Sequence, residues 1–284
     1  MPYHGSPEET VPAAAAEDPD WLPPEINTSV AHPARVYDYF LGGKDNFAAD
    51  RALADAVAEA MPSAALMARA NRAFLGRAVR YLATEAGVRQ FLDVGTGIPT
   101  AGNTHELAQA VAPDSRVVYV DNDPIVLAHA RALMTSDPAG VTAFIEADLR
   151  EPATILADPA LRRTLDLGEP IALMLIAILM YVGDEDKPRE LVAELVDALP
   201  SGSYLTVTHP TADFNPEETA AAVAATRQGG ISFTARGEAD VAAFFTGLDL
   251  VDPGVAPVLA WHPDGHAPAD PRAAYYYAAM GRKP

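Results

Sequence analysis

The sequence predicts an α/β protein with a mostly parallel sheet and an antiparallel edge, and three observations support this. After Gly87, short apolar runs alternate with helical segments, which implies parallel strands joined by crossover helices. A glycine-rich turn follows the first apolar run, as is typical of ligand-binding α/β sheets. Near the C-terminus, two strand-like runs follow one another without a long helix between them, which indicates an antiparallel pair.

The expected elements follow from apolar spacing. Strands are expected at residues 90–94, 116–120, 142–145, 171–178 and 203–208. Helices are expected between them, at residues 102–111, 124–134, 152–165 and 187–199. The antiparallel pair is expected at residues 248–251 and 274–280, with a turn at Pro253-Gly254 after the first run.

The N-terminal part divides into two segments. Residues 1–32 are rich in proline, alanine and acid and lack an apolar period, so they are expected to form a flexible leader. Residues 33–86 show helical spacing interrupted at Gly42-Gly43 and Pro62, and we expect them to form a helical lid. With the α/β core at 87–284, the lid would complete a single domain over residues 33–284.

Composition restricts the function classes. The formal charge of −19 disfavours a nucleic-acid partner or an acidic membrane surface, because both require clustered basic residues. The absence of cysteine removes disulfides and thiolate metal sites and is compatible with a cytoplasmic protein. The longest apolar run is too short to cross a bilayer and reads as a buried strand.

The most informative motif joins the end of the first strand to the following helix. Asp93 is followed by Gly95 and Gly97, which let the backbone turn tightly and approach a ligand without Cβ contact. A tight turn without a ligand would show the same glycine pair. The motif therefore needs support from other strand ends.

Two later acids supply that support. Asp121 ends the second strand, at the spacing where a carboxylate meets ribose hydroxyls in nucleotide sites, and Asp148 follows the third strand. The alternative is that each acid caps a helix, since such junctions favour aspartate. Three acids at successive strand ends, together with the Gly-x-Gly turn, favour a ligand-binding site over three separate helix caps.

The type of nucleotide follows from two residues. A dinucleotide fingerprint would carry a third glycine where this chain has Thr100. The Asp93 carboxylate suits a ligand with an ammonium and a sulfonium better than one with two phosphates. These features favour S-adenosylmethionine over NAD.

Residues 33–283 resemble the actinobacterial S-adenosyl methyltransferase family. The resemblance rests on residues 35–47, 71–74, 91–100, 118–124, 248–254 and 261–264. It implies the Rossmann-like methyltransferase fold, with a seven-stranded, mostly parallel sheet and an antiparallel C-terminal edge strand. It also implies that the methionine moiety lies among Asp93, Gly95 and Gly97. The residues implied for the remainder of the cofactor are Asp121 and Asn122 for the ribose, and Asp148 and the Leu149 amide for the adenine.

Further site residues are weaker candidates. Arg35 and Lys44 flank the lid turn and could bind the methionine carboxylate, or be ordinary solvated charges. Tyr181 and His209 follow the fourth and fifth strands and are the candidate catalytic bases, although Tyr181 suits a packing role as well. Methyl transfer also proceeds by alignment alone, without a dedicated base. Arg72 fits a solvated helix face better than a cofactor role.

The sequence therefore predicts a methyltransferase acting on a small molecule. One alternative is a protein that senses S-adenosylmethionine or its demethylated product without transferring a methyl group. A less favoured alternative is an NAD-dependent oxidoreductase. No metal site is expected: the acidic run 184–186 suits a helix N-terminus, and the group His262, Asp264 and His266 falls in a loop rich in proline and glycine.

Overall fold

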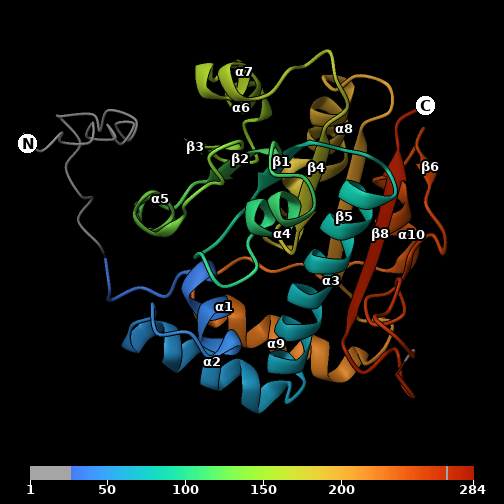
Figure 1. Ribbon diagram of the computed structural model, residues 1–284. Helices are drawn as coiled ribbons and strands as arrows, with labels where there is room; N and C mark the ends of the chain where they lie inside the picture. The colour runs from blue at the N-terminus through green and yellow to red at the C-terminus, as the bar shows by residue number, and fades with distance from the viewer. Residues whose placement is uncertain (1–26, 267) are drawn as a thin grey trace, which may run out of the picture.

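The computed structural model describes residues 27–266 and 268–284 (Figure 1). Most of the expected leader, residues 1–26, lies outside the described residues. The described part begins with the short segment that leads into the first helix.

Three helices precede the sheet, as predicted: α1 (Pro33–Leu41), α2 (Ala48–Ala60) and α3 (Ala64–Thr84). Helix α1 ends because Gly42 adopts a left-handed conformation, with φ of 82°. Helix α2 ends before Met61 and Pro62, which lead into α3. The long helix α3 is buried along much of its length. Whether the first two helices act as a lid stays a prediction.

The described residues form one sheet of eight strands in the order β3-β2-β1-β4-β5-β8-β6, with β7 paired to β8. The five strands that pair in parallel are β1 (Gln90–Val94), β2 (Arg116–Asp121), β3 (Val141–Glu146), β4 (Ala172–Ile176) and β5 (Tyr204–Pro210). The strands of the antiparallel part are β6 (Asp249–Leu250), β7 (Ala256–Pro257) and β8 (Tyr276–Arg282).

The predicted fold class is confirmed: a mostly parallel α/β sheet with an antiparallel edge. The C-terminal strand β8 lies between β5 and β6, so the two-residue β6 borders the sheet. The two-residue β7 raises the strand number from the expected seven to eight.

Helices cover both faces of the sheet and create two hydrophobic cores. One core joins α3, α4 (Thr104–Val111) and α5 (Pro124–Leu133) to the face that carries Phe91 and Tyr119. The other joins α6 (Pro152–Ala157), α7 (Pro159–Thr164), α8 (Pro188–Asp197) and α10 (Glu238–Ala243) to the face that carries Leu92 and Val118. Adjacent strand residues alternate between the two cores, as strand geometry requires.

One expected helix is divided. Residues 152–165 form α6 and α7, because Pro159 cannot continue the hydrogen bonding of α6. Asp158 instead caps α7 by accepting a hydrogen bond from the amide of Ala160. The prediction of one continuous helix was therefore wrong.

The helices α1, α2 and α9 (Pro216–Gln228) gather at one end of the molecule (Figure 1). The same end receives the carboxyl ends of the parallel strands, followed after β4 by two short 3₁₀ turns, η1 (Leu179–Tyr181) and η2 (Asp184–Asp186). This arrangement places a helical cover over the strand ends, where open α/β sheets bind ligands.

Candidate functional site

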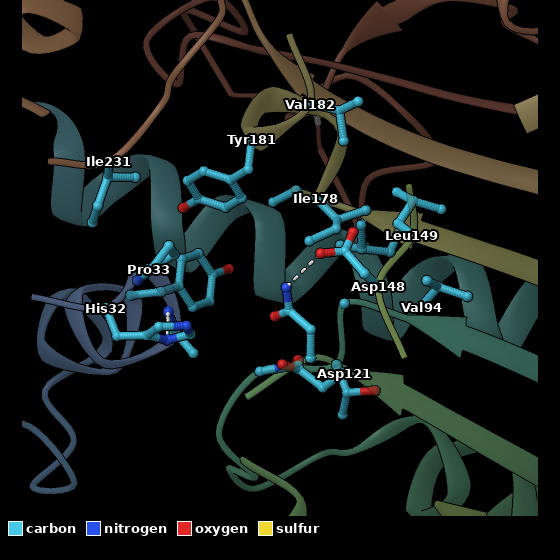
Figure 2. A pocket seen from close by; sticks show the side chains of 18 of the residues that line it. His32, Pro33, Val94, Asp121, Asp148, Leu149, Ile178, Tyr181, Val182 and Ile231 are labelled. Atoms are coloured by element: carbon cyan, nitrogen blue, oxygen red, sulfur yellow. Dashed lines mark hydrogen bonds between the residues drawn. The ribbon is translucent and has the colours of Figure 1, made fainter. Parts of the chain in front are cut away.

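A cavity of about 410 Å³ lies at the carboxyl ends of β1, β2, β3 and β4 (Figure 2). Its floor consists of the strand ends, and its walls come from the start of α1, from α3 and from the loop after α9. The predicted site residues that line it are Asp93, Gly95, Gly97, Asp121, Asn122, Asp148, Leu149 and Tyr181.

The glycine turn after β1 has the backbone shape that the sequence predicts. Gly95 and Gly97 have φ values of 79° and 69°, a region that other residues rarely adopt. A Cβ atom on Gly95 would overlap the Ile178 side chain, which follows β4. A Cβ atom on Gly97 would meet nothing within 4 Å, so this backbone faces open space.

Asp121 fixes this turn from the neighbouring strand. Its Oδ2 accepts a hydrogen bond from the Gly97 amide at 2.9 Å, and its Oδ1 accepts one from the Asp123 amide at 2.9 Å. Burial raises the pKa of Asp121, while these two amides act in the opposite direction. Each carboxylate oxygen retains a lone pair for a further donor.

Asp93 is the most deeply placed acid of the cavity. It is 6% exposed, and its Oδ2 accepts a hydrogen bond from the Thr104 hydroxyl at 2.6 Å. Burial raises the pKa of Asp93 to about 6, although the Thr104 hydrogen bond and the nearby Arg72 lower it. A cationic ligand beside Asp93 would stabilise the ionised form of this buried carboxyl.

Asp148 differs from the other two acids because Arg150 neutralises it. Three donors of Arg150 contact its carboxylate: the backbone amide, Nε and Nη2. Asn122 donates a further hydrogen bond at 2.9 Å (Figure 2, dashed line). The Arg150 side chain is the main reason that the pKa of Asp148 falls to about 2. Asn122 is thus held between the second and third strand ends.

Arg35 and Lys44, the residues expected to bind the methionine carboxylate, do not line the cavity. Arg35 is 3% exposed and faces inward, where Nε lies 3.2 Å from Asp50 Oδ1 and Nη2 donates to the Val30 carbonyl. Its charge stabilises the start of the helical segment. Lys44 is exposed on the turn between α1 and α2.

Arg72 lines the cavity, as Arg150 does, and the sequence interpretation of Arg72 as part of a solvated helix face missed this. Its Nη2 donates to the carbonyls of Thr100 and Ala101 and to Oδ1 of Asn103. Its Nε is buried and has no hydrogen-bond partner among the described residues. The available signal was Asn71-Arg72 within the motif at 71–74, on a helix packed beside the glycine turn.

His209, a candidate base in the sequence, does not line the cavity. It is fully buried, and its two ring nitrogens have fixed partners. Nδ1 lies 2.9 Å from the Pro210 carbonyl, which can only accept, and Nε2 lies 2.9 Å from Nη1 of Arg236, which can only donate. The ring is therefore neutral with its hydrogen on Nδ1. Burial lowers the pKa of His209 to about 4.

Arg236 connects His209 to the wall of the cavity. Its guanidinium donates to the carbonyls of Leu179 and Val182, which flank Tyr181. Nη2 also pairs with Asp184 at 2.7 Å. Arg236 thereby holds the 3₁₀ turn η1 in place from the loop that follows α9.

Tyr181, the other candidate base, lines the cavity. Burial raises the pKa of Tyr181 well above its ordinary value, so its phenol keeps its proton at neutral pH. Within the described part of the chain its hydroxyl has no hydrogen-bond partner. Figure 2 shows this hydroxyl turned toward the side of the cavity where Pro33 and Ile231 lie.

The clusters discounted in the sequence are engaged in local contacts. Asp264 pairs with Arg80 at 2.7 Å, and His262 Nε2 contacts the Asp252 carbonyl. Over residues 27–266 and 268–284, no group of three potential ligands is placed to hold a metal ion. In the same residues, no helix combines the length and the apolar character that crossing a bilayer requires.

The donor set of the cavity fits S-adenosylmethionine. Asp93 offers a carboxylate to an ammonium, and the Arg72 guanidinium at the cavity wall offers a positive charge to a carboxylate. Asp121 offers acceptors to hydroxyl groups. The open backbone at Gly97 leaves space for close approach. The negative charge beside the turn disfavours a pyrophosphate.

Comparison with known proteins gives an independent result. The model of a family described as S-adenosyl methyltransferase matches residues 19–284. A DUF574 family protein from Streptomyces avermitilis MA-4680 is 48% identical, with a TM-score of 0.88, and the match covers 90% of this chain and 99% of that one. A structure from Thermobifida fusca YX, provisionally assigned as a methyltransferase, is 42% identical, with a TM-score of 0.84 and coverage of 93% and 99%.

A more distant structure shares the fold. The SAM-dependent methyltransferase from Anabaena variabilis ATCC 29413 is 14% identical, with a TM-score of 0.50, and the match covers 91% of this chain and 98% of that one. The search of proteins with curated functions found no match.

Proposed function

Because this chain belongs to the S-adenosyl methyltransferase family, we propose that it transfers a methyl group from S-adenosylmethionine to a small molecule bound beside Tyr181. The observation that carries this proposal is the convergence of Asp93, Arg72 and Asp121 on one cavity. These three side chains offer complementary partners to the amino-acid half and the ribose of that cofactor.

The cofactor would be held along the strand ends. We assign the ammonium to Asp93, the carboxylate to Arg72 and the ribose hydroxyls to Asp121. Asn122 and Leu149 would border the adenine at the third strand end. Asp148 supports this wall, because its hydrogen bonds with Asn122 and Arg150 fix the loop after β3.

When bound, S-adenosylmethionine supplies an electrophilic methyl carbon on a sulfonium. Transfer of this methyl group to an acceptor atom would leave S-adenosylhomocysteine as the second product. A proton on the acceptor atom would be lost to solvent after the transfer. The protein contributes alignment and exclusion of water, which suffice for a displacement of this kind.

Tyr181 would orient the acceptor rather than deprotonate it. Its raised pKa makes the phenolate scarce at neutral pH, and its hydroxyl has no partner within the described residues. A hydrogen bond from this hydroxyl would hold a polar atom of the acceptor. The formal charge of −19 supports a small molecule over a nucleic acid as acceptor, because phosphate binding needs clustered cations.

Calorimetric titration tests the cofactor class. S-Adenosylmethionine and S-adenosylhomocysteine should bind, and NAD should not. Binding of NAD alone would refute the proposal. A screen of cell extract with radiolabelled S-adenosylmethionine then tests transfer: the enzyme should yield a labelled small product, whereas a sensor that only binds the cofactor would yield none.

A further inference from the structure

A second, smaller cavity adjoins the first beneath α1, α2 and α9. Its volume is about 70 Å³, and four residues line both cavities: Pro33, Tyr37, Tyr181 and Ile231. The remaining lining is largely aliphatic, with methionines at positions 61, 67 and 180. The two cavities therefore meet at the wall that carries the Tyr181 side chain.

No residue that lines the small cavity carries a formal charge, within the part of the chain that the structure describes. Its polar groups are mostly satisfied by the protein itself. The Tyr37 hydroxyl donates to the Ala68 carbonyl and accepts from Asn71, while the Thr226 hydroxyl donates to the Ala222 carbonyl. These groups are not available to a ligand without loss of their present partners.

The other two hydroxyls behave differently from each other. The Tyr276 hydroxyl contacts the Met180 sulfur at 3.5 Å. The Tyr181 hydroxyl has no partner within the described residues, and it points to the side of Pro33 and Ile231, which line both cavities (Figure 2). A ligand that crosses this junction meets apolar walls and one open hydroxyl.

We infer that the small cavity is part of the acceptor subsite and that it takes an uncharged apolar group, a short branched alkyl chain or one edge of a single ring, while Tyr181 at the junction of the two cavities binds a polar atom of the acceptor. A charged group would lose its hydration there without a compensating partner. The volume is less than half of the roughly 150 Å³ of an engineered cavity that binds benzene, so the small cavity admits a short alkyl branch or one edge of a ring, and the rest of a ring lies at the junction with the larger cavity. The remainder of the acceptor would extend into the larger cavity.

The inference rests on the proposed function, and the two can be tested separately. S-Adenosylhomocysteine binding, measured by calorimetry, tests the larger cavity alone. With that ligand saturating, ¹⁹F NMR of 4-fluorophenol and 4-fluorobenzoate tests the small cavity. We expect 4-fluorophenol to bind with a Kd on the order of 1 mM, a typical value for so small a ligand, and 4-fluorobenzoate at least tenfold more weakly.

Two substitutions on α9 form a matched pair. Ala222 lines the small cavity, whereas Ala224 is exposed on the same helix. Ala222→Leu should weaken 4-fluorophenol binding at least tenfold, and Ala224→Leu should leave it unchanged. Both variants should bind S-adenosylhomocysteine within twofold of the wild type. Equal 4-fluorophenol binding by the two variants would overturn the inference.

Tyr181→Phe gives a test that does not depend on filling the cavity. This substitution should weaken the binding of 4-fluorophenol about tenfold. The affinity for fluorobenzene, which lacks a hydroxyl, should stay within twofold of the wild-type value. Preferential binding of 4-fluorobenzoate, or absence of 4-fluorophenol binding to wild-type protein that binds S-adenosylhomocysteine, would refute the subsite. Loss of S-adenosylhomocysteine binding by the wild type would instead refute the proposed function.

Discussion

The Gly97 amide donates a hydrogen bond to Asp121 Oδ2 at 2.9 Å, so the acid at the end of β2 holds the glycine turn that follows β1. The same carboxylate is assigned to the ribose. Removal of this side chain therefore affects both the shape of the turn and a direct contact with the ligand.

Asp121→Ala should weaken S-adenosylhomocysteine binding by about 1–3 kcal/mol, the loss expected for a charge-assisted hydrogen bond. Binding of 5′-methylthioadenosine, which retains the ribose but lacks the amino-acid half, should weaken equally. Calorimetry measures both affinities. Asp114→Ala, at an exposed position before β2, is the control. Unchanged affinity in the Asp121 variant would contradict the ribose assignment.

Arg72→Met should separate the two halves of the ligand. S-Adenosylhomocysteine should lose at least tenfold in affinity, because its carboxylate loses a guanidinium partner. 5′-Methylthioadenosine should bind within twofold of the wild type. Arg80→Met removes an exposed arginine from the same helix and should change neither affinity. A parallel loss for both ligands would mean that Arg72 acts through the loop at Thr100 and Ala101 instead.

Asp93 should make cofactor binding depend on pH. Burial raises its pKa to about 6, and the ammonium of the ligand requires the ionised form. S-Adenosylhomocysteine affinity should therefore fall about tenfold per pH unit below pH 6. The Asp93→Asn variant should bind S-adenosylhomocysteine weakly, with an affinity that does not change with pH. Calorimetry across about pH 5–8 measures this.

The same raised pKa means that the ionised Asp93 side chain lowers the stability of the ligand-free protein. A raised carboxyl pKa means that the folded chain binds more protons than the unfolded chain between pH 3.8 and about 6, so stability falls as the pH rises through this window. Asp93→Asn should therefore raise the free energy of unfolding above pH 6, by up to about 3 kcal/mol. Urea denaturation at pH 7 measures it. A destabilised variant would contradict this account.

His209 should influence stability rather than cofactor binding. Its pKa falls from 6.5 to about 4 on folding, so the unfolded chain binds more protons between these values and stability declines as the pH falls through them. This contribution amounts to about 3 kcal/mol. His209→Gln should remove that pH slope in urea denaturation and leave S-adenosylhomocysteine affinity within twofold at pH 7. Lost affinity with retained stability would restore a role at the site.

The sheet could be predicted because its parallel strands are short, apolar and separated by helices. The junction acids Asp93, Asp121 and Asp148 could be predicted for a related reason: parallel strands bring their carboxyl ends to one edge of the sheet. The division of α6 from α7 was also present in the sequence, as Asp158-Pro159, and was overlooked.

Side-chain direction could not be predicted in the same way. Arg35 and Arg72 both lie on apolar-faced helices, and only their packing decides that Arg35 faces Asp50 while Arg72 faces the glycine turn. His209 follows Thr208 along β5, and successive strand residues point to opposite faces. Thr208 contacts Asn71 on the side of α3, so His209 points into the other core, against Phe244.

Arg236 donates hydrogen bonds to the carbonyls of Leu179 and Val182, and this has a geometric consequence for the proposed transfer step. In-line displacement tolerates little angular error between the incoming atom and the departing sulfur. The guanidinium of Arg236 restrains the backbone on both sides of Tyr181. In the proposed transfer, the Tyr181 hydroxyl would then meet the acceptor from a backbone that is already positioned.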